Sequence, residues 1–111
     1  MPAFECQASR EADHTRLSLY GELDIAAATD FEAALEELER DGPERILLDL
    51  RGLTFLDSTG LRVLLGADTR ARGAGRRLII LQGPEAVRRV FEITGLEERL
   101  ELVDDEASLA S

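Results

Sequence analysis

The apolar run at residues 46–50, Ile-Leu-Leu-Asp-Leu, is the feature of the sequence that most constrains the fold. Apart from its aspartate it is apolar at every position, so neither of its alternating faces is polar. Such continuous apolarity is typical of a central strand that is covered on both faces, as in a parallel sheet. Parallel neighbours need a crossover connection, usually a helix. We therefore expect an α/β domain organised around this strand.

The segment before this run predicts a hairpin and a helix. Residues 4–10 and 15–21 have the pattern of two strands joined by a short polar link. Apolar residues then recur every three or four positions over 25–40, which is the spacing of an amphipathic helix. We expect Ile25 to begin its apolar stripe and Asp24 to be its N-cap.

The segment after the run continues the alternation of helices and strands. We expect helices at 58–72, 84–94 and 104–110, and strands at 78–81 and 100–103. The predicted fold is therefore a mixed five-stranded sheet, an opening hairpin followed by parallel strands, with about four helices. The whole chain, residues 1–111, is expected to be a single domain.

Composition and charge exclude several classes of function. The chain has 13 basic and 23 acidic residues, and this net charge of −10 disfavours binding to nucleic acid or to anionic membranes. No stretch approaches the apolar length of a membrane span, and the first residues do not resemble a secretory signal. Cys6 is the only cysteine and cannot form an internal disulfide. We expect a cytoplasmic protein.

Few residues could support catalysis or hold a cofactor. The sequence has one histidine, His14, which lies in the predicted hairpin turn, and it has no lysine. Metal-ligand spacings, phosphate-binding loops and dinucleotide-binding glycine motifs are all missing from the sequence. Asp49 could accept a phosphoryl group only with an acidic pair and a lysine nearby, and the sequence places neither there. We expect a non-enzyme without metal or cofactor.

Residues 53–61, Leu-Thr-Phe-Leu-Asp-Ser-Thr-Gly-Leu, connect the central strand to the second long helix. Ser58 lies where a helix N-cap is expected, because its hydroxyl oxygen can accept a bond from a backbone N–H two or three residues later. The start of a helix also tolerates an anion, since its N–H groups are unpaired. Our hypothesis is that Ser58 carries a switchable phosphate.

Four motifs resemble the STAS domain family, and within it the bacterial anti-sigma factor antagonists. They occur in the family's order and span nearly the whole chain: Leu-Tyr-Gly-Glu-Leu-Asp at 19–24, Ile-Leu-Leu-Asp-Leu at 46–50, Leu-Asp-Ser-Thr-Gly-Leu at 56–61 and Phe-Glu-Ile-Thr-Gly-Leu at 91–96.

The resemblance implies a partner-switching role. In such proteins the matching serine, here Ser58, is phosphorylated by an anti-sigma factor with serine kinase activity, and a PP2C-type phosphatase removes the phosphate. The unphosphorylated form binds the anti-sigma factor and releases the sigma factor. The implied partner-binding residues are Asp24, Asp57, Ser58, Thr59, Gly60, Leu61 and Arg62. The oligomeric state is left open.

Two alternatives share the same sequence features. One is a STAS subunit of a lipid-transport complex or a signalling scaffold, which need not be phosphorylated. The other is an enzyme with Ser58 as nucleophile, against which the lack of a neighbouring base argues.

Overall fold

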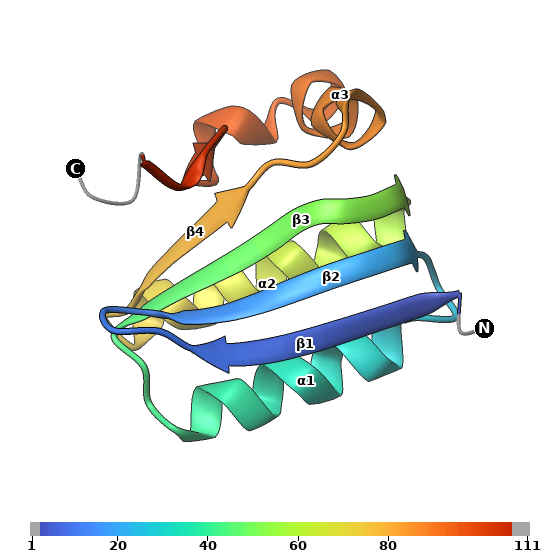
Figure 1. Ribbon diagram of the computed structural model, residues 1–111. Coiled ribbons are helices and arrows are strands. Elements are labelled where there is room, and N and C mark those ends of the chain that lie inside the picture. Colours follow the sequence, from blue (N-terminus) through green and yellow to red (C-terminus); the bar gives the residue numbers. More distant parts are fainter. Residues whose placement is uncertain (1–2, 108–111) are drawn as a thin grey trace.

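The computed structural model describes residues 3–107, which form a mixed five-stranded sheet in the order β1-β2-β3-β4-β5 (Figure 1). β1 and β2 are antiparallel, and the other neighbouring strands are parallel. This confirms the predicted sheet. The strands are β1 (Phe4–Arg10), β2 (Thr15–Leu23), β3 (Arg45–Leu56), β4 (Arg77–Leu81) and β5 (Leu102–Val103).

Three α-helices connect or flank these strands: α1 (Ala28–Arg40), α2 (Ser58–Gly73) and α3 (Glu85–Thr94). A short 3-10 helix at Leu96–Glu98 follows α3, and Gly95 ends α3 in the left-handed conformation with φ 73°. α1 and α2 lie together against one face of the sheet (Figure 1). A fourth α-helix was expected at 104–110, and residues 108–110 of that segment lie outside the described residues.

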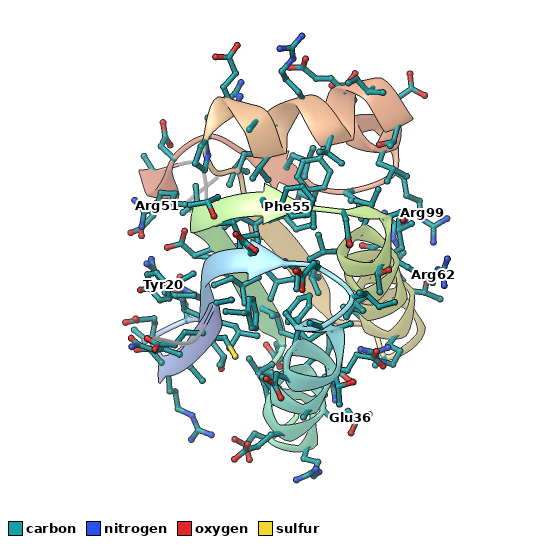
Figure 2. All side chains as sticks on the ribbon, turned by 90° about the vertical axis from the view of Figure 1, so that its right-hand side faces the viewer. Tyr20, Glu36, Arg51, Phe55, Arg62 and Arg99 are labelled. Atoms are coloured by element: carbon teal, nitrogen blue, oxygen red, sulfur yellow. The ribbon has the colours of Figure 1, made fainter. Side chains whose placement is uncertain are left out.

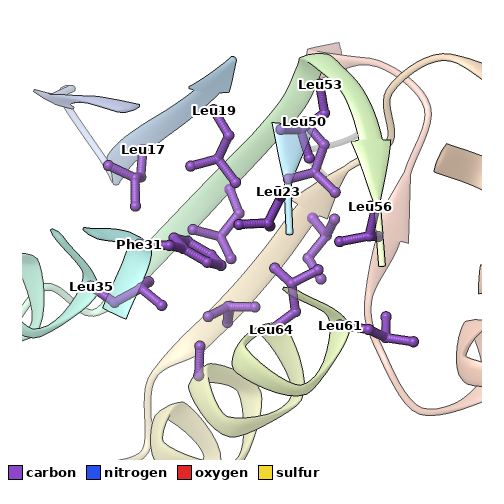
Figure 3. Packing of buried hydrophobic residues seen from close by; sticks show 14 of the residues in the cluster. Leu17, Leu19, Leu23, Phe31, Leu35, Leu50, Leu53, Leu56, Leu61 and Leu64 are labelled. Atoms are coloured by element: carbon purple, nitrogen blue, oxygen red, sulfur yellow. The ribbon is translucent and has the colours of Figure 1, made fainter. Parts of the chain in front are cut away.

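The central strand β3 carries the core. Ile46, Leu48 and Leu50 are buried in the main apolar cluster, where side chains from β2, α1 and α2 meet them (Figure 3). The intervening Leu47 is buried in a smaller cluster with Ile79. Because successive side chains of a strand point to opposite faces, β3 is covered on both sides, as its continuous apolarity predicts.

β3 is longer than the apolar run indicates. Residues 53–56 continue the strand, whereas the sequence predicted that they belong to a connection, and this prediction was wrong. The extension follows from burial, because Leu53 and Leu56 are both enclosed in the core and Leu56 pairs with Leu23 of β2. The connection to α2 is therefore reduced to Asp57.

Asp49 lies in the middle of β3 and is only 6% exposed, yet both of its carboxylate oxygens are paired. Oδ1 accepts bonds from the Arg51 backbone N–H at 3.0 Å and from Arg51 Nε at 3.1 Å. Oδ2 accepts from Arg51 Nη2 at 2.9 Å and from Arg16 Nη1 at 3.2 Å. Both arginines also contact Glu106, which ties the C-terminal segment to the sheet. The Asp49 carboxylate therefore contributes to the fold through its ion pairs with these two arginines.

Acid is expected to destabilise the fold partly through this carboxylate. Burial raises the pKa of Asp49, but hydrogen bonds from Arg51 and the charges of Arg51 and Arg16 lower it more, so that the net shift is downward. A lowered folded-state pKa contributes stability that is present above the unfolded-state pKa and is lost as the pH falls through the folded-state value, here below about pH 4. Urea unfolding at several pH values checks this. Asp49→Asn should show a shallower acid dependence than the unmodified chain, and equal slopes would contradict the assignment.

Candidate functional site

The candidate site lies at the carboxyl ends of β2 and β3, which are side by side. This end of the sheet faces the viewer in Figure 2. Leu23 and Leu56 are register partners, and each is followed by an aspartate, Asp24 or Asp57. The backbone N–H of Asp57 donates to the carbonyl of Leu23 at 3.2 Å, which fixes the two strand ends to each other. Open α/β sheets place their working loops at this carboxyl edge.

Asp57 is the N-cap of α2. Its Oδ1 accepts hydrogen bonds from the backbone N–H groups of Thr59 and Gly60, each at 3.0 Å. The prediction that Ser58 is the N-cap was therefore wrong, and Ser58 is the first residue of the helix. The physical reason is that the carboxylate one residue earlier already takes two of the unpaired N–H groups, and its negative charge suits the helix start.

The side chain of Ser58 is left free by this arrangement. Ser58 is exposed, and its hydroxyl has no hydrogen-bond partner among residues 3–107. Arg62, one helical turn further along α2, is also exposed and points away from the body of the molecule (Figure 2). A modifying enzyme can thus reach the hydroxyl without disturbing a bond of the fold.

The prediction that Asp24 is the N-cap of α1 was wrong, because Ala27 holds that position; Asp24 instead closes the turn after β2. Its Oδ1 accepts from the backbone N–H groups of Ala26 and Ala27, each at 3.1 Å. These bonds form a turn that precedes α1, so the helix begins at Ala28 and not at Ile25 as predicted. Ile25 is consequently 75% exposed, and its expected place on the buried stripe was wrong. The aspartate-bonded turn after β2 and the aspartate-capped start of α2 therefore lie next to each other at this edge.

Gly60 and Leu61 lie beneath the exposed part of the site. A Cβ on Gly60 would lie 2.7 Å from Leu23 Cγ and 2.8 Å from the Leu23 carbonyl oxygen, so only glycine lets α2 approach β2 this closely. Leu61 is 8% exposed and packs in the core near Leu56 (Figure 3). These two residues position the helix start, while Ser58, the half-buried Thr59 and Arg62 form its surface.

Two apolar side chains at this edge were not anticipated as site residues. Phe55, which is labelled in Figure 2, is 49% exposed, and Ile25 is 75% exposed. Phe55 pairs with Glu22 at an irregularity in the β2–β3 register, which accounts for an outward side chain between two buried leucines. Exposed large apolar residues grouped at one end of a domain are typical of a protein-binding surface. No sequence signal marks the irregularity, so the pattern alone could not have found them.

Removal of the α2 cap is expected to destabilise the protein without changing its core. Asp57→Ala should lower the free energy of unfolding by about 1–2 kcal/mol, because two backbone N–H groups lose their acceptor. Asp57→Asn is the matched control, since asparagine caps about as well as aspartate. Urea denaturation measures both. Equal losses in the two variants would show that the charge of Asp57, and not its capping bonds, stabilises the helix start.

His14 lies too far from Ser58 to act as its base. It is in the β1–β2 turn, as predicted, and its Nδ1 is 2.7 Å from Asp13 Oδ1. The nine residues of β2 separate this turn from the candidate site, a length of about 30 Å. Within the described part of the chain, no three metal-ligating side chains are grouped. None of the described helices combines the length and apolarity needed to cross a membrane.

Comparison with known proteins identifies the family. A family model described as "Mlab, STAS domain" matches residues 6–104. The anti-sigma-B factor antagonist of Listeria monocytogenes is 31% identical over 100 residues, which cover 90% of this chain and 88% of that protein. An anti-sigma factor antagonist from Mycobacterium paratuberculosis superposes with a TM-score of 0.87 at 24% identity, over 95% of this chain and 89% of that one.

A third comparison concerns a phosphorylated protein. The Bacillus cell fate determinant SpoIIAA in its phosphorylated form has a TM-score of 0.71 at 24% identity, over 96% of this chain and 97% of that one. At such identities the structural likeness shows a shared fold, whereas the family model and the Listeria protein show kinship. The chain therefore belongs to the STAS domain family, as a relative of its anti-sigma factor antagonists.

Proposed function

We propose that this protein is an anti-sigma factor antagonist whose binding to an anti-sigma factor is turned off by phosphorylation of Ser58. The observation that carries the proposal is the exposed hydroxyl of Ser58 at the first position of α2, which has no hydrogen-bond partner in the described part of the chain. The chain is also related to a protein named an anti-sigma-B factor antagonist. The partner is an anti-sigma factor with serine kinase activity, and a PP2C-type phosphatase restores the binding form. The cycle takes place in the cytoplasm, and the antagonist is its substrate and not its catalyst.

Phosphate on Ser58 is expected to leave the fold intact. It adds about −1.5 to −2 charges, which the helix dipole favours by about 0.3–1 kcal/mol. The carboxylate of Asp57 already occupies the N–H groups of Thr59 and Gly60 and repels a second anion, so little of this gain remains. A protein of the same fold has been solved in a phosphorylated form, which agrees with this expectation.

The binding surface is more sensitive to this charge than the fold. The exposed side chains of Ile25 and Phe55 flank the strand ends, and Arg62 lies one turn after Ser58. A partner that covers these apolar groups together with the start of α2 must also remove water from the Ser58 side chain. A phosphate there resists dehydration and repels acidic groups of the partner, at a cost of several kcal/mol. The phosphate is therefore expected to prevent partner binding while the protein stays folded.

The direct test is intact-mass measurement after incubation with the candidate kinase and ATP. We expect one added phosphate on the unmodified chain and none on Ser58→Ala, with Thr59→Ala and Thr54→Ala still modified. Ser58→Ala should change the free energy of unfolding by less than about 0.5 kcal/mol, because its hydroxyl makes no bond and Asp57 is the cap. Phosphate on the Ser58→Ala variant would transfer the acceptor role to a threonine and overturn the proposal.

A further inference from the structure

β1 is an edge strand whose outer side is open. Among residues 3–107 it pairs with β2 alone, in a regular register over seven residues that include neither proline nor a bulge. Two of the features by which proteins block an edge, a proline and a bulge, are therefore missing from this strand. An extended segment can add to such an edge through main-chain hydrogen bonds.

The unused main-chain groups of β1 belong to alternate residues. The Glu22 N–H donates to the carbonyl of Ala3, and the Glu11 N–H donates to that of His14, both at 2.8 Å. In an antiparallel pair every second residue bonds to the neighbour, so the odd-numbered residues of β1 face β2. The N–H and C=O groups of the even-numbered residues point to the free edge: Phe4, Cys6, Ala8 and Arg10.

A groove between β1 and α1 runs beside this edge. It has a volume of about 360 Å³, in the range of ligand-binding clefts. Its apolar lining comes from Cys6, Ala8, Leu17, Ala34 and Leu38. Phe4 and Cys6 pack toward the core, so the even-numbered residues of β1 share the face that lies against α1. A strand added to β1 would place its own alternate side chains in this groove.

The groove is negatively charged. Glu37 and Asp41 of its rim are exposed carboxylates, and Arg10 contacts Asp41 at 3.4 Å. A second copy of the chain would bring the same carboxylates to the edge and be repelled. A complementary occupant therefore carries positive charge.

We propose that the groove between β1 and α1 binds an extended segment of a partner protein, added as a sixth strand to the free edge of β1. An apolar side chain of the segment lies on the floor between Ala8 and Leu38, and lysine or arginine side chains beside it face Glu37. The site is at the hairpin end of β1, whereas Ser58 follows the opposite end of β2 and β3 (Figure 1). Both surfaces can be occupied at once, so the second contact does not depend on the phosphate.

The test is an NMR titration of the full chain with the peptide acetyl-Thr-Arg-Thr-Leu-Thr-Arg-Thr-amide, whose alternate residues suit the groove. We expect amide shifts confined to β1 and to residues 34–41, and binding about tenfold tighter than for the peptide with glutamates in place of arginines. N-methylation of every second peptide residue blocks the N–H groups on one side of the added strand. One of the two possible sets of methyl groups should abolish binding, and the other set should be tolerated. Equal effects of both sets, or no saturation at about 1 mM peptide, would overturn the proposal.

Two variants locate the site on the protein. Glu37→Arg should weaken the basic peptide about tenfold, whereas Glu36→Arg, on the same helix but outside the groove, should leave its affinity within about twofold. Ala8→Phe should fill the groove and block binding, with urea unfolding as the check on folding. Ser58→Asp should bind the peptide unchanged. Equal losses for Glu37→Arg and Glu36→Arg, or a dimer of the chain that Ala8→Phe dissociates, would count against a basic partner segment.

Discussion

Ser58→Asp is expected to weaken binding to the anti-sigma factor about a hundredfold, which corresponds to about 2–3 kcal/mol. The new carboxylate would lie on the exposed surface at the first position of α2, one residue after Asp57. A partner covering that surface must dehydrate a charge for which the site offers little compensation, because Asp57 has taken the capping N–H groups. Isothermal titration calorimetry with the purified anti-sigma factor measures the loss.

The control for this prediction is Ser58→Asn, which has nearly the same shape without the charge. It should bind within a few-fold of the unmodified protein. Both variants should unfold within about 0.5 kcal/mol of the unmodified chain, because the favourable helix dipole and the repulsion from Asp57 nearly cancel for the aspartate. If asparagine weakens binding as much as aspartate, steric fit and not charge controls the surface. The kinase assay on Ser58→Ala is independent of this outcome.

The sequence predicted the fold well because the fold depends on periodic apolar patterns. The run at 46–50 is apolar on both faces, and the structure buries it completely in the centre of the sheet. The order of strands and helices and the opening hairpin follow from equally local signals. Register irregularities and the ends of elements depend on tertiary contacts, so the extension of β3 to Leu56 was not visible in the pattern.

The site was predicted less completely, because short capping motifs compete at adjacent residues. Ser58 and Asp57 are both good N-caps, and the sequence does not say which of them reaches the helix N–H groups. The turn after Asp24 has the same ambiguity, since a helix started at Ile25 satisfies the periodicity equally well. At α2 the capping aspartate lies one residue before Ser58, which leaves the Ser58 side chain exposed. After β2 the turn at Asp24 delays α1 to Ala28, which leaves Ile25 exposed.

Gly60→Ala is expected to lower the free energy of unfolding by about 2 kcal/mol, although alanine is the better helix former. The added methyl group would lie 2.7 Å from Leu23 Cγ, 2.8 Å from the Leu23 carbonyl oxygen and 2.9 Å from Leu56 Cδ1. A backbone oxygen held in the sheet cannot yield as a flexible side chain can, so the start of α2 must move away from β2. The hydrogen bond from the Asp57 N–H to Leu23, now 3.2 Å, should lengthen.

Gly66→Ala provides the matched control on the same helix. A Cβ there meets only the flexible end of Arg70, with Nη1 at 3.4 Å, so the gain in helix propensity of about 1 kcal/mol should dominate and stabilise the protein. Urea unfolding of the two variants should thus give opposite signs for the same chemical change, and amide shifts of Gly60→Ala should include Asp57. If both variants are stabilised, the start of α2 can retreat from β2 at little cost, and the position of Ser58 is less firmly fixed by packing than these contacts imply.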